Sequence, residues 1–315
     1  MAHHHISFPM SKTALVIGAT GLLGRGVAAE LLSQSWRVVA VSRGRKIIPE
    51  NPHIEESVIL DRSDPAALNG AFAGRRFDLV VDCAAYTAEH AKGAIDVFAG
   101  TTGHYFFIST DFVYAPAADA TFPISEDAVK NVSLPYSVGK LEAESLLLER
   151  CRLGGFPVTI LRPPHILGAG NAPGCDPAAG GRDPTLPVRL LAGEAIPLLA
   201  DGQFLIQPVW SREIGRMIGA LAGLSKAIGG IFNAPGSECV TIRRYYDLLA
   251  DILGVPLSIC PVASDEFCRT HPDKAHIARH RIYDLSALAA LGISPSLSLK
   301  DALSETIGWL RTQAQ

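Results

Sequence analysis

The run Ala14-Leu-Val-Ile-Gly18-Ala-Thr-Gly21-Leu-Leu-Gly24 decides the fold, because it joins an apolar strand to a glycine-rich turn. A helix is predicted to open directly afterwards, over 25–32. Gly18 permits the tight turn, Gly21 lets the backbone approach a pyrophosphate closely, and Gly24 allows the helix to pack near the strand. The helix N-terminus offers free N–H groups to the phosphates. Ahead of a βαβ unit, the run predicts a dinucleotide site rather than an ordinary glycine-rich turn.

Composition places the chain among well-packed globular proteins. It has 315 residues, enough for one extended domain or two unequal ones, with 48% hydrophobic and 19% charged residues. The net charge of −3 gives no electrostatic footprint for nucleic acid. No apolar run of the sequence reaches the 18 residues that suggest a membrane span, and none reads as a secretory signal.

Two smaller sequence features bear on the setting of the chain. Residues 1–10 carry a short histidine run and are interpreted as an added leader, with the natural start at Met10. The six cysteines form no C-x-x-C pair, which favours a reduced, cytoplasmic compartment. Cys83 lies in an apolar run, where it is expected to act as a small buried hydrophobic residue.

The first half of the chain alternates apolar runs with helical stretches. Strands are predicted over 13–17, 37–42, 57–61, 78–83, 105–109 and 158–162. This pattern is typical of an α/β fold, a Rossmann-type doubly wound parallel sheet with right-handed crossovers. We expect this domain to comprise 11–166 and 207–234. A smaller α/β substrate-binding domain is expected to comprise 167–206 and 235–315.

The composition of the sequence changes near Gly168. Residues 168–184 are dense in glycine and proline, so neither a helix nor a central strand is expected there. This segment is interpreted either as a loop on the substrate side, disordered without ligand, or as a tolerated surface insertion. Beyond it, a helix is predicted over 211–224, a returning strand over 230–233, and a helix up to residue 253 with Thr241 as its N-cap.

Tyr136-Ser-Val-Gly-Lys140 is the second informative motif. Pro135 suits a first helical turn, and residues i and i+4 of a helix lie on one face, so Tyr136 and Lys140 would project together. A nearby ammonium group favours the phenolate and lowers the tyrosine pKa toward neutrality. Tyr136 could then exchange a proton with a substrate hydroxyl. Taken alone, the motif also fits a surface pair on an amphipathic helix.

Ser109 and Thr110 end the strand predicted over 105–109. Because ligands bind beyond the carboxyl ends of the strands in an open α/β sheet, their hydroxyls could hydrogen-bond a reacting oxygen. A role in capping the following loop is the structural alternative.

Together these motifs resemble the extended short-chain dehydrogenase/reductase superfamily of nucleotide-sugar epimerases, dehydratases and reductases. The resemblance rests on the glycine triplet at 18–24, Ser-Thr-Asp-Phe-Val-Tyr at 109–114, Tyr136-x-x-x-Lys140 and Leu-Arg-Pro-Pro-His-Ile-Leu-Gly at 161–168. It covers most of the chain and weakens after Gly168. The run at 78–87 further resembles a branch that includes the chloroplast stem-loop-binding proteins.

The resemblance implies roles for individual residues. Thr110, helped by Ser109, takes the catalytic Ser/Thr position, Tyr136 is the acid/base, and Lys140 holds the nicotinamide ribose. The implied cofactor-binding residues are Gly18, Thr20, Gly21, Leu22, Leu23, Gly24, Ser42, Arg43, Asp61, Arg62, Ala84, Ala85, Tyr86, Tyr136, Lys140 and Pro163. Asp61 would close the third strand near the adenine. The implied substrate-facing residues are Asp111, Phe112 and His165, the last of which also fits a hydrogen-bonded histidine in a turn.

Departures from the family pattern narrow the reaction. Dehydratases of the family resemble one another in an Asp-Glu pair after the catalytic Thr, whereas here Phe112 follows Asp111, as in dTDP-dehydrorhamnose reductases. A dehydratase is therefore disfavoured. Many relatives that bind nucleotide diphosphates carry an arginine where this chain has Ile206, which puts a nucleotide-diphosphate substrate in doubt and leaves a free sugar, polyol or other hydroxy or keto compound open.

The cofactor preference is predicted from the run Val41-Ser42-Arg43-Gly-Arg45-Lys46 at the end of the second strand. An acid there favours NAD, whereas an arginine accommodates the 2′-phosphate of NADP, so NADP is favoured over NAD. Arg43 as a solvated loop charge is the alternative. No metal site is expected, although His276 and His280 could share a helix face.

Two classes of function follow. The first is an NAD(P)-dependent epimerase or reductase acting on a secondary alcohol or ketone of a sugar-like or nucleotide-sugar substrate. The alternative is a non-catalytic Rossmann protein that senses cofactor or binds RNA, against which the intact Thr110, Tyr136 and Lys140 set and the mild acidity argue. The resemblance also implies a homodimer, formed through the Tyr136 helix and the helix before it. Gly139 and Ala143 would permit close helix approach, although an ordinary buried helix would look the same.

Overall fold

The computed structural model describes residues 12–45, 54–116 and 121–313, so the leader predicted at 1–10 and Lys46 lie outside the described residues. Its strands are β1 Thr13–Ile17, β2 Arg37–Ser42, β3 Ile54–Ile59, β4 Leu79–Asp82, β5 Tyr105–Ile108, β6 Val158–Arg162, β7 Ile166–Leu167, β8 Ile196–Leu199, β9 Leu205–Ile206, β10 Val209–Trp210, β11 Ile231–Asn233, β12 Val240–Thr241 and β13 Ile259–Val262. Its α-helices are α1 Leu22–Ser33, α2 Pro65–Phe72, α3 Ala88–Phe98, α4 Pro135–Arg152, α5 Leu186–Leu191, α6 Ser211–Leu221, α7 Ile242–Leu253, α8 Ser264–Thr270, α9 Ser286–Ala289 and α10 Leu299–Gln313.

The predicted parallel sheet is confirmed. Its order is β11-β6-β5-β4-β1-β2-β3, and every neighbouring pair is parallel. The strand order reverses between β1 and β4, so their two following loops diverge and leave a crevice at the carboxyl ends. The fold therefore places the glycine turn after β1 where a ligand is expected.

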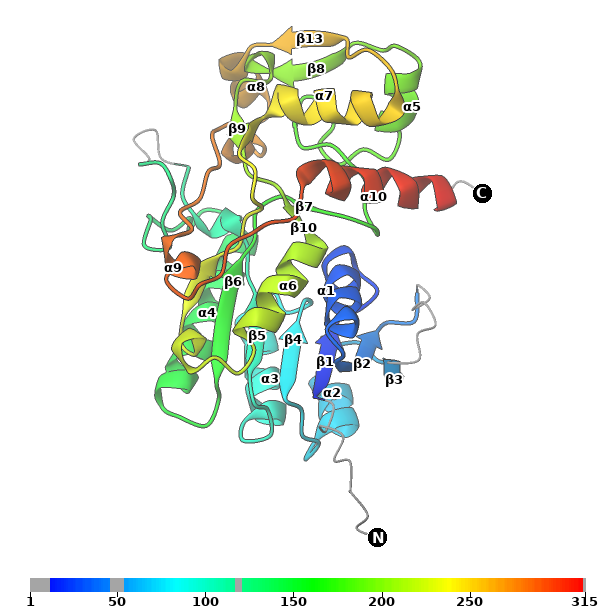
Figure 1. The fold of residues 1–315 in the computed structure, drawn as a ribbon. Coiled ribbons are helices and arrows are strands. Elements are labelled where there is room, and N and C mark those ends of the chain that lie inside the picture. The colour runs from blue at the N-terminus through cyan, green and yellow to red at the C-terminus, as the bar shows by residue number, and fades with distance from the viewer. Residues whose placement is uncertain (1–11, 46–53, 117–120, 314–315) are drawn as a thin grey trace.

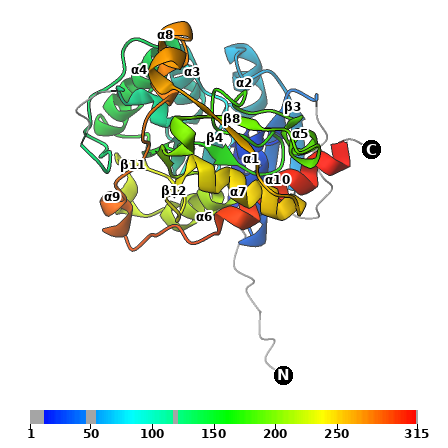
Figure 2. The same cartoon turned by 90° about the horizontal axis from the view of Figure 1, so that it is seen from above.

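Alternating side chains of the central strands build a core on each face of the sheet. Ala14 and Val16 pack with residues of α1 and α6, whereas Leu15 and Ile17 pack with residues of α2, α3 and α4. Seen from above in Figure 2, α2, α3 and α4 lie on one side and α6 and α9 on the other. The continuous apolar runs of the sequence reflect this two-sided burial.

Two predicted elements begin earlier than expected. The third strand, predicted at 57–61, is Ile54–Ile59, so Asp61 follows β3 instead of closing it. As an edge strand that pairs only with β2, β3 carries exposed Glu55 and Glu56, which hid its start in the sequence. Helix α1 begins at Leu22 rather than at residue 25.

A smaller group of elements covers the carboxyl ends of the large sheet. It contains β8, β13, α5, α7 and α10, which Figure 1 shows above β4, β5 and β6. Thr241 caps α7, as predicted, because its hydroxyl accepts a hydrogen bond from the backbone N–H of Arg244. The predicted helix over 211–224 ends earlier, at Leu221, and the strand predicted over 230–233 is β11.

The loop over 168–184 contains neither helix nor strand, as predicted, but the expectation that it lacks order without a ligand was wrong. Cys175 and Ala179 are buried in one apolar cluster with Tyr245 and Tyr246 of α7. The tyrosine hydroxyls accept hydrogen bonds from backbone N–H groups of the loop at 3.1–3.4 Å, and Asp176 accepts one from the N–H of Leu199. The loop is therefore part of the core of the smaller group.

The small residues of α4 fit the alternative of an ordinary buried helix. A Cβ atom at Gly139 would lie 2.8 Å from the carbonyl oxygen of Tyr86, and Ala143 is fully buried in the core. Both residues therefore let α4 pack closely within its own chain and do not offer an outer contact surface. Helix α3 is the neighbour of α4 on this face. The predicted homodimer stays a prediction.

Candidate active site

The glycine turn has the geometry that a bound pyrophosphate needs. Gly18 has a positive φ of 85°, and its N–H donates to the carbonyl oxygen of Val41. A Cβ atom at Gly24 would lie 2.1 Å from the carbonyl oxygen of Gly18, so a side chain there would push the turn off the helix. Gly21 precedes α1 and offers no side-chain cap to its first turn. The cradle therefore fits a dinucleotide phosphate.

A cavity of about 560 Å³ adjoins this turn. Of the predicted cofactor residues, those that line it are Gly18, Thr20, Gly21, Ser42, Arg43, Asp61, Arg62, Ala84 and Tyr86. Sequence reasoning missed the other lining residues, which are Ile17, Val41, Arg45, Leu60, Ser63, Cys83 and His90. The remaining predicted cofactor residues do not line it: Leu22, Leu23, Gly24, Ala85, Tyr136, Lys140 and Pro163. Cys83, expected to be a small buried hydrophobic residue, is half-buried: it packs against the core and also lines the cavity.

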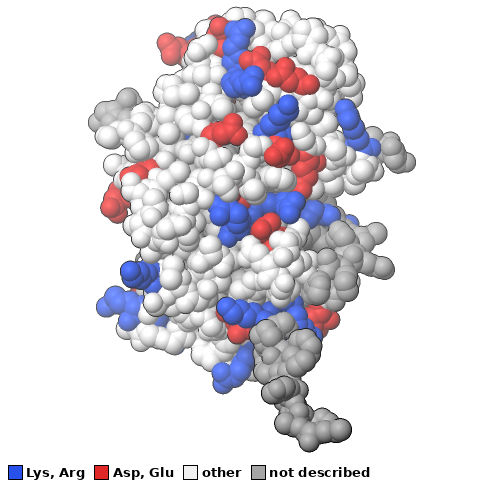
Figure 3. Space-filling view, in the orientation of Figure 1, with Lys and Arg blue, Asp and Glu red and all other residues white. Residues whose placement is uncertain are grey.

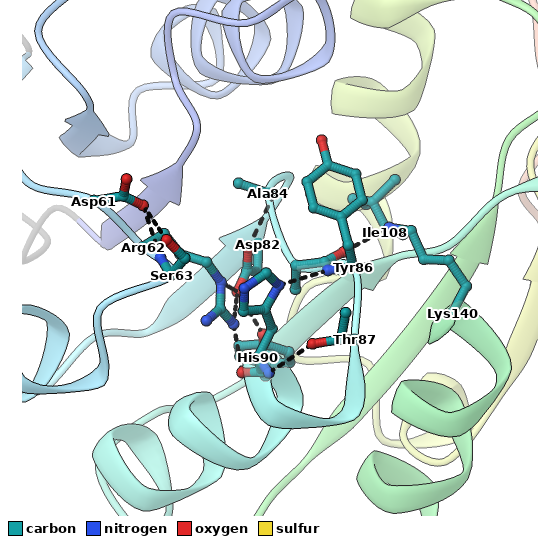
Figure 4. Close-up of polar contacts among 12 residues, drawn as sticks. Asp61, Arg62, Ser63, Asp82, Ala84, Tyr86, Thr87, His90, Ile108 and Lys140 are labelled. Carbon is teal, nitrogen blue, oxygen red and sulfur yellow. Dashed lines mark hydrogen bonds and ion pairs between the residues drawn. The ribbon is translucent and has the colours of Figure 1, made fainter. Parts of the chain in front are cut away.

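A buried ion pair supports one wall of this cavity (Figure 4). The Arg62 guanidinium lies 2.7 Å from the Asp82 carboxylate at the end of β4, and it also donates to the carbonyl oxygen of His90. Tyr105 donates to the same carboxylate at 2.9 Å. Burial and the Asp82 charge raise the pKa of the Tyr105 hydroxyl. Arg62 therefore holds the end of β4 and the start of α3 together at the cavity wall. The sequence had indicated only that Arg62 binds the cofactor.

The loop after β3 adds a carboxylate to the cavity rim. Asp61 is exposed and accepts hydrogen bonds from the N–H and the hydroxyl of Ser63, which lower its pKa. Across the rim, Arg43 and Arg45 both line the cavity at the end of β2, and Ser42 accepts a hydrogen bond from the N–H of Gly44. Arg43 and Arg45 are close enough to Asp61 for their charges to lower its pKa further.

Lys140 connects the cavity to the second motif. Helix α4 begins at Pro135, as predicted, and Lys140 is almost fully buried on it. Its ammonium group donates to the carbonyl oxygens of Ala85 and Ile108 at 2.6 Å each and lies over the Tyr86 ring, 4.7 Å from the centroid. Burial lowers the pKa of Lys140 to about 8, although the Asp82 charge opposes this. Ala85, a predicted cofactor residue, is thus an acceptor for Lys140.

Tyr136 lies on the exposed side of the same group. It keeps 43% of its surface exposed, and its ring centroid is 6.2 Å from that of Tyr86. The expectation that Lys140 lowers the tyrosine pKa was wrong for this structure. Burial raises the pKa of Tyr136 to about 12, and only a hydrogen bond with Thr110 lowers it. The ammonium group of Lys140 lies 5.9 Å from the centroid of the Tyr136 ring, on the same side of the helix as predicted, and donates to two backbone carbonyls.

The residues after β5 lie beside Tyr136. Thr110 is buried and its hydroxyl accepts a hydrogen bond from the N–H of Phe112, whose ring centroid lies 6.4 Å from that of Tyr136. Asp111 is buried and accepts a hydrogen bond from the Tyr283 hydroxyl at 2.6 Å. The Ser109 hydroxyl is buried without a hydrogen-bond partner among the described residues.

The loop that follows β6 carries the remaining predicted residues. The carbonyl oxygen of Pro163 accepts a hydrogen bond from the N–H of Asp111, which ties this loop to the one after β5. His165 is half-buried, and its Nε2 atom has no hydrogen-bond partner in the part of the chain that the structure describes. Burial and the charges of Arg182 and Arg281 hold the pKa of His165 well below its usual value.

The suggested histidine pair on one helix face was wrong. His276 lies in a short 3₁₀ turn, Ala275–Ile277, and its ring stacks edge-on against Phe112 at 5.0 Å. His280 lies beyond that turn and accepts a hydrogen bond from the N–H of Leu205. Within residues 12–45, 54–116 and 121–313, no group of three metal-ligating side chains comes together.

A parallel sheet with a phosphate cradle at its switch point, beside a Thr-Tyr-Lys set, defines the class of Rossmann proteins that bind a nicotinamide dinucleotide. The chain matches the NAD dependent epimerase/dehydratase family over residues 14–233, and it belongs to that family. The predicted membership of the extended short-chain dehydrogenase/reductase superfamily is thereby confirmed.

Three comparisons with individual proteins agree with the family match. The chain is 27% identical over 312 residues to dTDP-4-dehydrorhamnose reductase from Streptomyces griseus, covering 93% of this chain and 92% of that one. It is 27% identical over 264 residues to the chloroplast stem-loop binding protein of 41 kDa b from Arabidopsis thaliana, covering 80% and 66%. The structure of RMD from Pseudomonas aeruginosa complexed with NADPH superposes with a TM-score of 0.71 at 21% identity, covering 96% and 100%.

Proposed function

We propose that this chain is an NADP(H)-dependent reductase or epimerase that interconverts a secondary alcohol and a ketone of a sugar-like substrate. The observation that carries the proposal is the proximity of Thr110 and Tyr136 at the carboxyl end of β5, where the Thr110 hydroxyl acts on the pKa of Tyr136 and the Lys140 ammonium group lies 5.9 Å from the centroid of the Tyr136 ring. Tyr86 lies between this pair and the cofactor cavity, since it lines the cavity and contacts the Tyr136 ring. The proposal includes the domain division predicted from the sequence, with 11–166 and 207–234 binding the cofactor and 167–206 and 235–315 binding the substrate.

In this proposal the three residues act on one oxygen atom of the substrate. Tyr136 donates its proton to a ketone oxygen, or takes the proton of a hydroxyl in the reverse direction. Thr110, with Ser109 beside it, hydrogen-bonds the same oxygen and orients it. Lys140, whose ammonium group retains one donor beyond its two carbonyl partners, holds the ribose. When bound, the nicotinamide supplies or takes up the hydride.

In this proposal the resting form of Tyr136 is the protonated phenol, which is the form that the reductive direction uses. A phenol with a pKa of about 12 is protonated at neutral pH and is therefore ready to act as an acid. The likeness to dTDP-4-dehydrorhamnose reductase supports the same direction and a sugar-like substrate. Ile206, where many relatives that bind a nucleotide diphosphate have an arginine, argues against that substituent.

Tyr136→Phe tests the proposal. The variant should bind NADPH with near-normal affinity, measured by fluorescence titration, because its ring contacts remain. It should lose turnover of any carbonyl substrate that the wild type reduces, since the proton donor is gone. Turnover at the wild-type rate would contradict the assignment. The stoichiometry of NADPH consumed to product formed separates a reductase from an epimerase.

The alternative of a non-catalytic RNA-binding protein keeps one supporting observation, the likeness to a stem-loop binding protein. Acidic and basic side chains are interspersed on the face seen in Figure 3, which does not favour a polyanion. A salt-dependent gel shift with structured RNA at physiological ionic strength would support this alternative.

The homodimer remains a proposal from the resemblance. Over the described ranges, no helix is long and apolar enough to cross a bilayer.

A further inference from the structure

Arg281 presents a buried guanidinium group whose donors are largely unused. The residue is 4% exposed, and its Nε and Nη2 atoms have no hydrogen-bond partner among the described residues. Its Nη1 atom lies 3.9 Å from the Asp111 carboxylate, which is an ion-pair contact and longer than a hydrogen bond. A buried charge with two unsatisfied donors is costly unless something binds there.

The two free donors of Arg281 lie on the same edge of the guanidinium plane. Nε–H and the outer N–H of Nη2 point in parallel, so this edge can donate two hydrogen bonds to the two oxygens of one carboxylate. The Asp111 carboxylate cannot fill that role, because its Oδ2 atom accepts the Tyr283 hydroxyl and faces Nη1. The free edge therefore fits a planar, two-oxygen anion from outside the chain.

Arg182 adds a second cation without a carboxylate partner. Its Nη2 atom donates to the carbonyl oxygen of Ile166 at 2.6 Å, whereas its Nη1 atom has no partner in the described part of the chain. Burial and the Arg281 charge lower the pKa of Arg182, so the two guanidinium groups are within electrostatic reach of each other. Both groups also act on His165, whose Nε2 atom is unpartnered.

The acids around this cluster do not neutralise it. Asp176 is close enough to interact with Arg281, but its two oxygens accept the N–H groups of Ala178 and Leu199. Burial raises the pKa of Asp176. Asp111 is the acid in ion-pair contact with Arg281. Among the described residues Arg182 makes no ion pair, so the two guanidinium groups have one direct carboxylate contact between them.

The position of the cluster relative to the Thr110–Tyr136 pair decides what it can recognise. Asp111, which Arg281 contacts, directly follows Thr110 in the chain. His165 precedes β7, which Figure 1 shows between the large sheet and α10. His165 and Arg182 are half-buried, so the cluster is not sealed from solvent. An anion bound by Arg281 would thus lie near the reacting end of the substrate.

We propose that Arg281, Arg182 and His165 bind a carboxylate of the substrate, which makes a sugar acid or another hydroxy or keto acid the substrate class. This inference rests on the proposed function, because it concerns the same site. The free edge of Arg281 takes the two carboxylate oxygens, and Arg182 and His165 add donors around them. A phosphate group is the other anion that guanidinium groups bind, and the test distinguishes the two.

The test compares matched ligands on the NADPH-loaded protein by isothermal titration calorimetry. The pairs are D-glucuronate with D-glucose, D-galacturonate with D-galactose, and UDP-glucuronate with UDP-glucose, and D-glucose 6-phosphate is the phosphate probe. We expect the carboxylated member of at least one pair to bind about tenfold to a hundredfold more tightly than its neutral partner. Equal affinity within all three pairs, or a preference for the phosphate probe over every carboxylate, would overturn the proposal.

Variants assign the preference to the cluster. Arg281→Lys keeps the charge but loses the two-donor edge, and Arg281→Gln loses both, so each should remove most of the carboxylate preference. Arg182→Gln, on the loop, should reduce it and serves if the Arg281 variants do not fold. Arg243→Gln, which removes an exposed ion pair with Asp201, is the matched control and should retain it. Full preference in Arg281→Gln and Arg182→Gln would also contradict the proposal.

A separate titration with NADPH alone distinguishes this inference from the proposed function. Wild-type protein that fails to bind NADPH would remove both. Protein that binds NADPH and depends on Tyr136 for turnover, but shows no carboxylate preference, would remove only the inference.

Discussion

The ammonium group of Lys140 lies 4.7 Å from the centroid of the Tyr86 ring and is held there by two backbone carbonyl oxygens. Tyr86 in turn forms part of the cofactor cavity, and its ring contacts that of Tyr136. A single buried cation thus underlies both the cavity and the candidate acid/base residue. Its burial has a measurable consequence for stability.

Lys140→Met should abolish a rise in stability that the wild type shows at alkaline pH. The pKa of Lys140 is about 8 in the folded protein and 10.5 ordinarily, so the unfolded state binds more protons between these values. The free energy of unfolding of the wild type should therefore rise, relative to Lys140→Met, by about 2 kcal/mol between pH 8 and pH 10. Urea unfolding of both proteins across this range measures the difference. A difference that stays constant or falls with pH would contradict the prediction.

Gly24→Ala should disrupt the turn that cradles the phosphates. The added Cβ atom would meet the carbonyl oxygen of Gly18, which is backbone and cannot rotate away. We expect a loss of about 2 kcal/mol or more in the free energy of unfolding and a marked loss of NADPH affinity. Gly70→Ala is the control, because Gly70 is exposed on α2 and an added Cβ atom would meet nothing within 4 Å. This variant should raise the free energy of unfolding by about 1 kcal/mol or less, since alanine favours the helix over glycine. Equal changes in the free energy of unfolding and in NADPH affinity for the two variants would contradict this role of Gly24.

Replacing both Arg43 and Arg45 by Gln should lower the preference for NADPH over NADH. The two cations line the cavity where the 2′-phosphate is expected, and a charge-assisted hydrogen bond there corresponds to about tenfold or more in affinity. Parallel fluorescence titrations with both cofactors give the ratio. Arg37→Gln, at the start of β2 in an ion pair with Glu55, should leave the ratio unchanged. An unaltered ratio in the double variant would rule out these arginines as the basis of the preference.

The sequence was sufficient where a local pattern and its packing agree. The apolar runs that become β1, β2 and β6 are buried on both faces of the sheet, so their bounds were predicted correctly. Strand β3 was misplaced because an edge strand does not need apolar residues on every position. The loop over 168–184 looked unstructured because its order comes from the hydroxyls of Tyr245 and Tyr246, more than 60 residues later in the chain.

Some residues of the candidate site could be predicted from the sequence, and others could not. Motifs with fixed spacing indicated the glycine turn, Thr110, Tyr136 and Lys140. The sequence could not indicate Arg281, because its partner Asp111 lies 170 residues away and only the fold brings them together. The pKa of Tyr136 was mistaken for a related reason, since helical spacing says which residues share a face but not how far the fold removes each side chain from water.

Glu305, near the end of the chain, gives the substrate side an unexpected anchor. Its carboxylate on α10 accepts hydrogen bonds from the N–H of Ala169 and the indole N–H of Trp210, and the neighbouring Thr306 accepts one from the N–H of Gly168. The loop that carries Arg182 therefore starts from a point fixed by the final helix. Side chains of α10 thus reach the cluster around Arg281 through the backbone of this loop, although within the described residues neither Glu305 nor Thr306 forms a hydrogen bond or ion pair with the cluster itself.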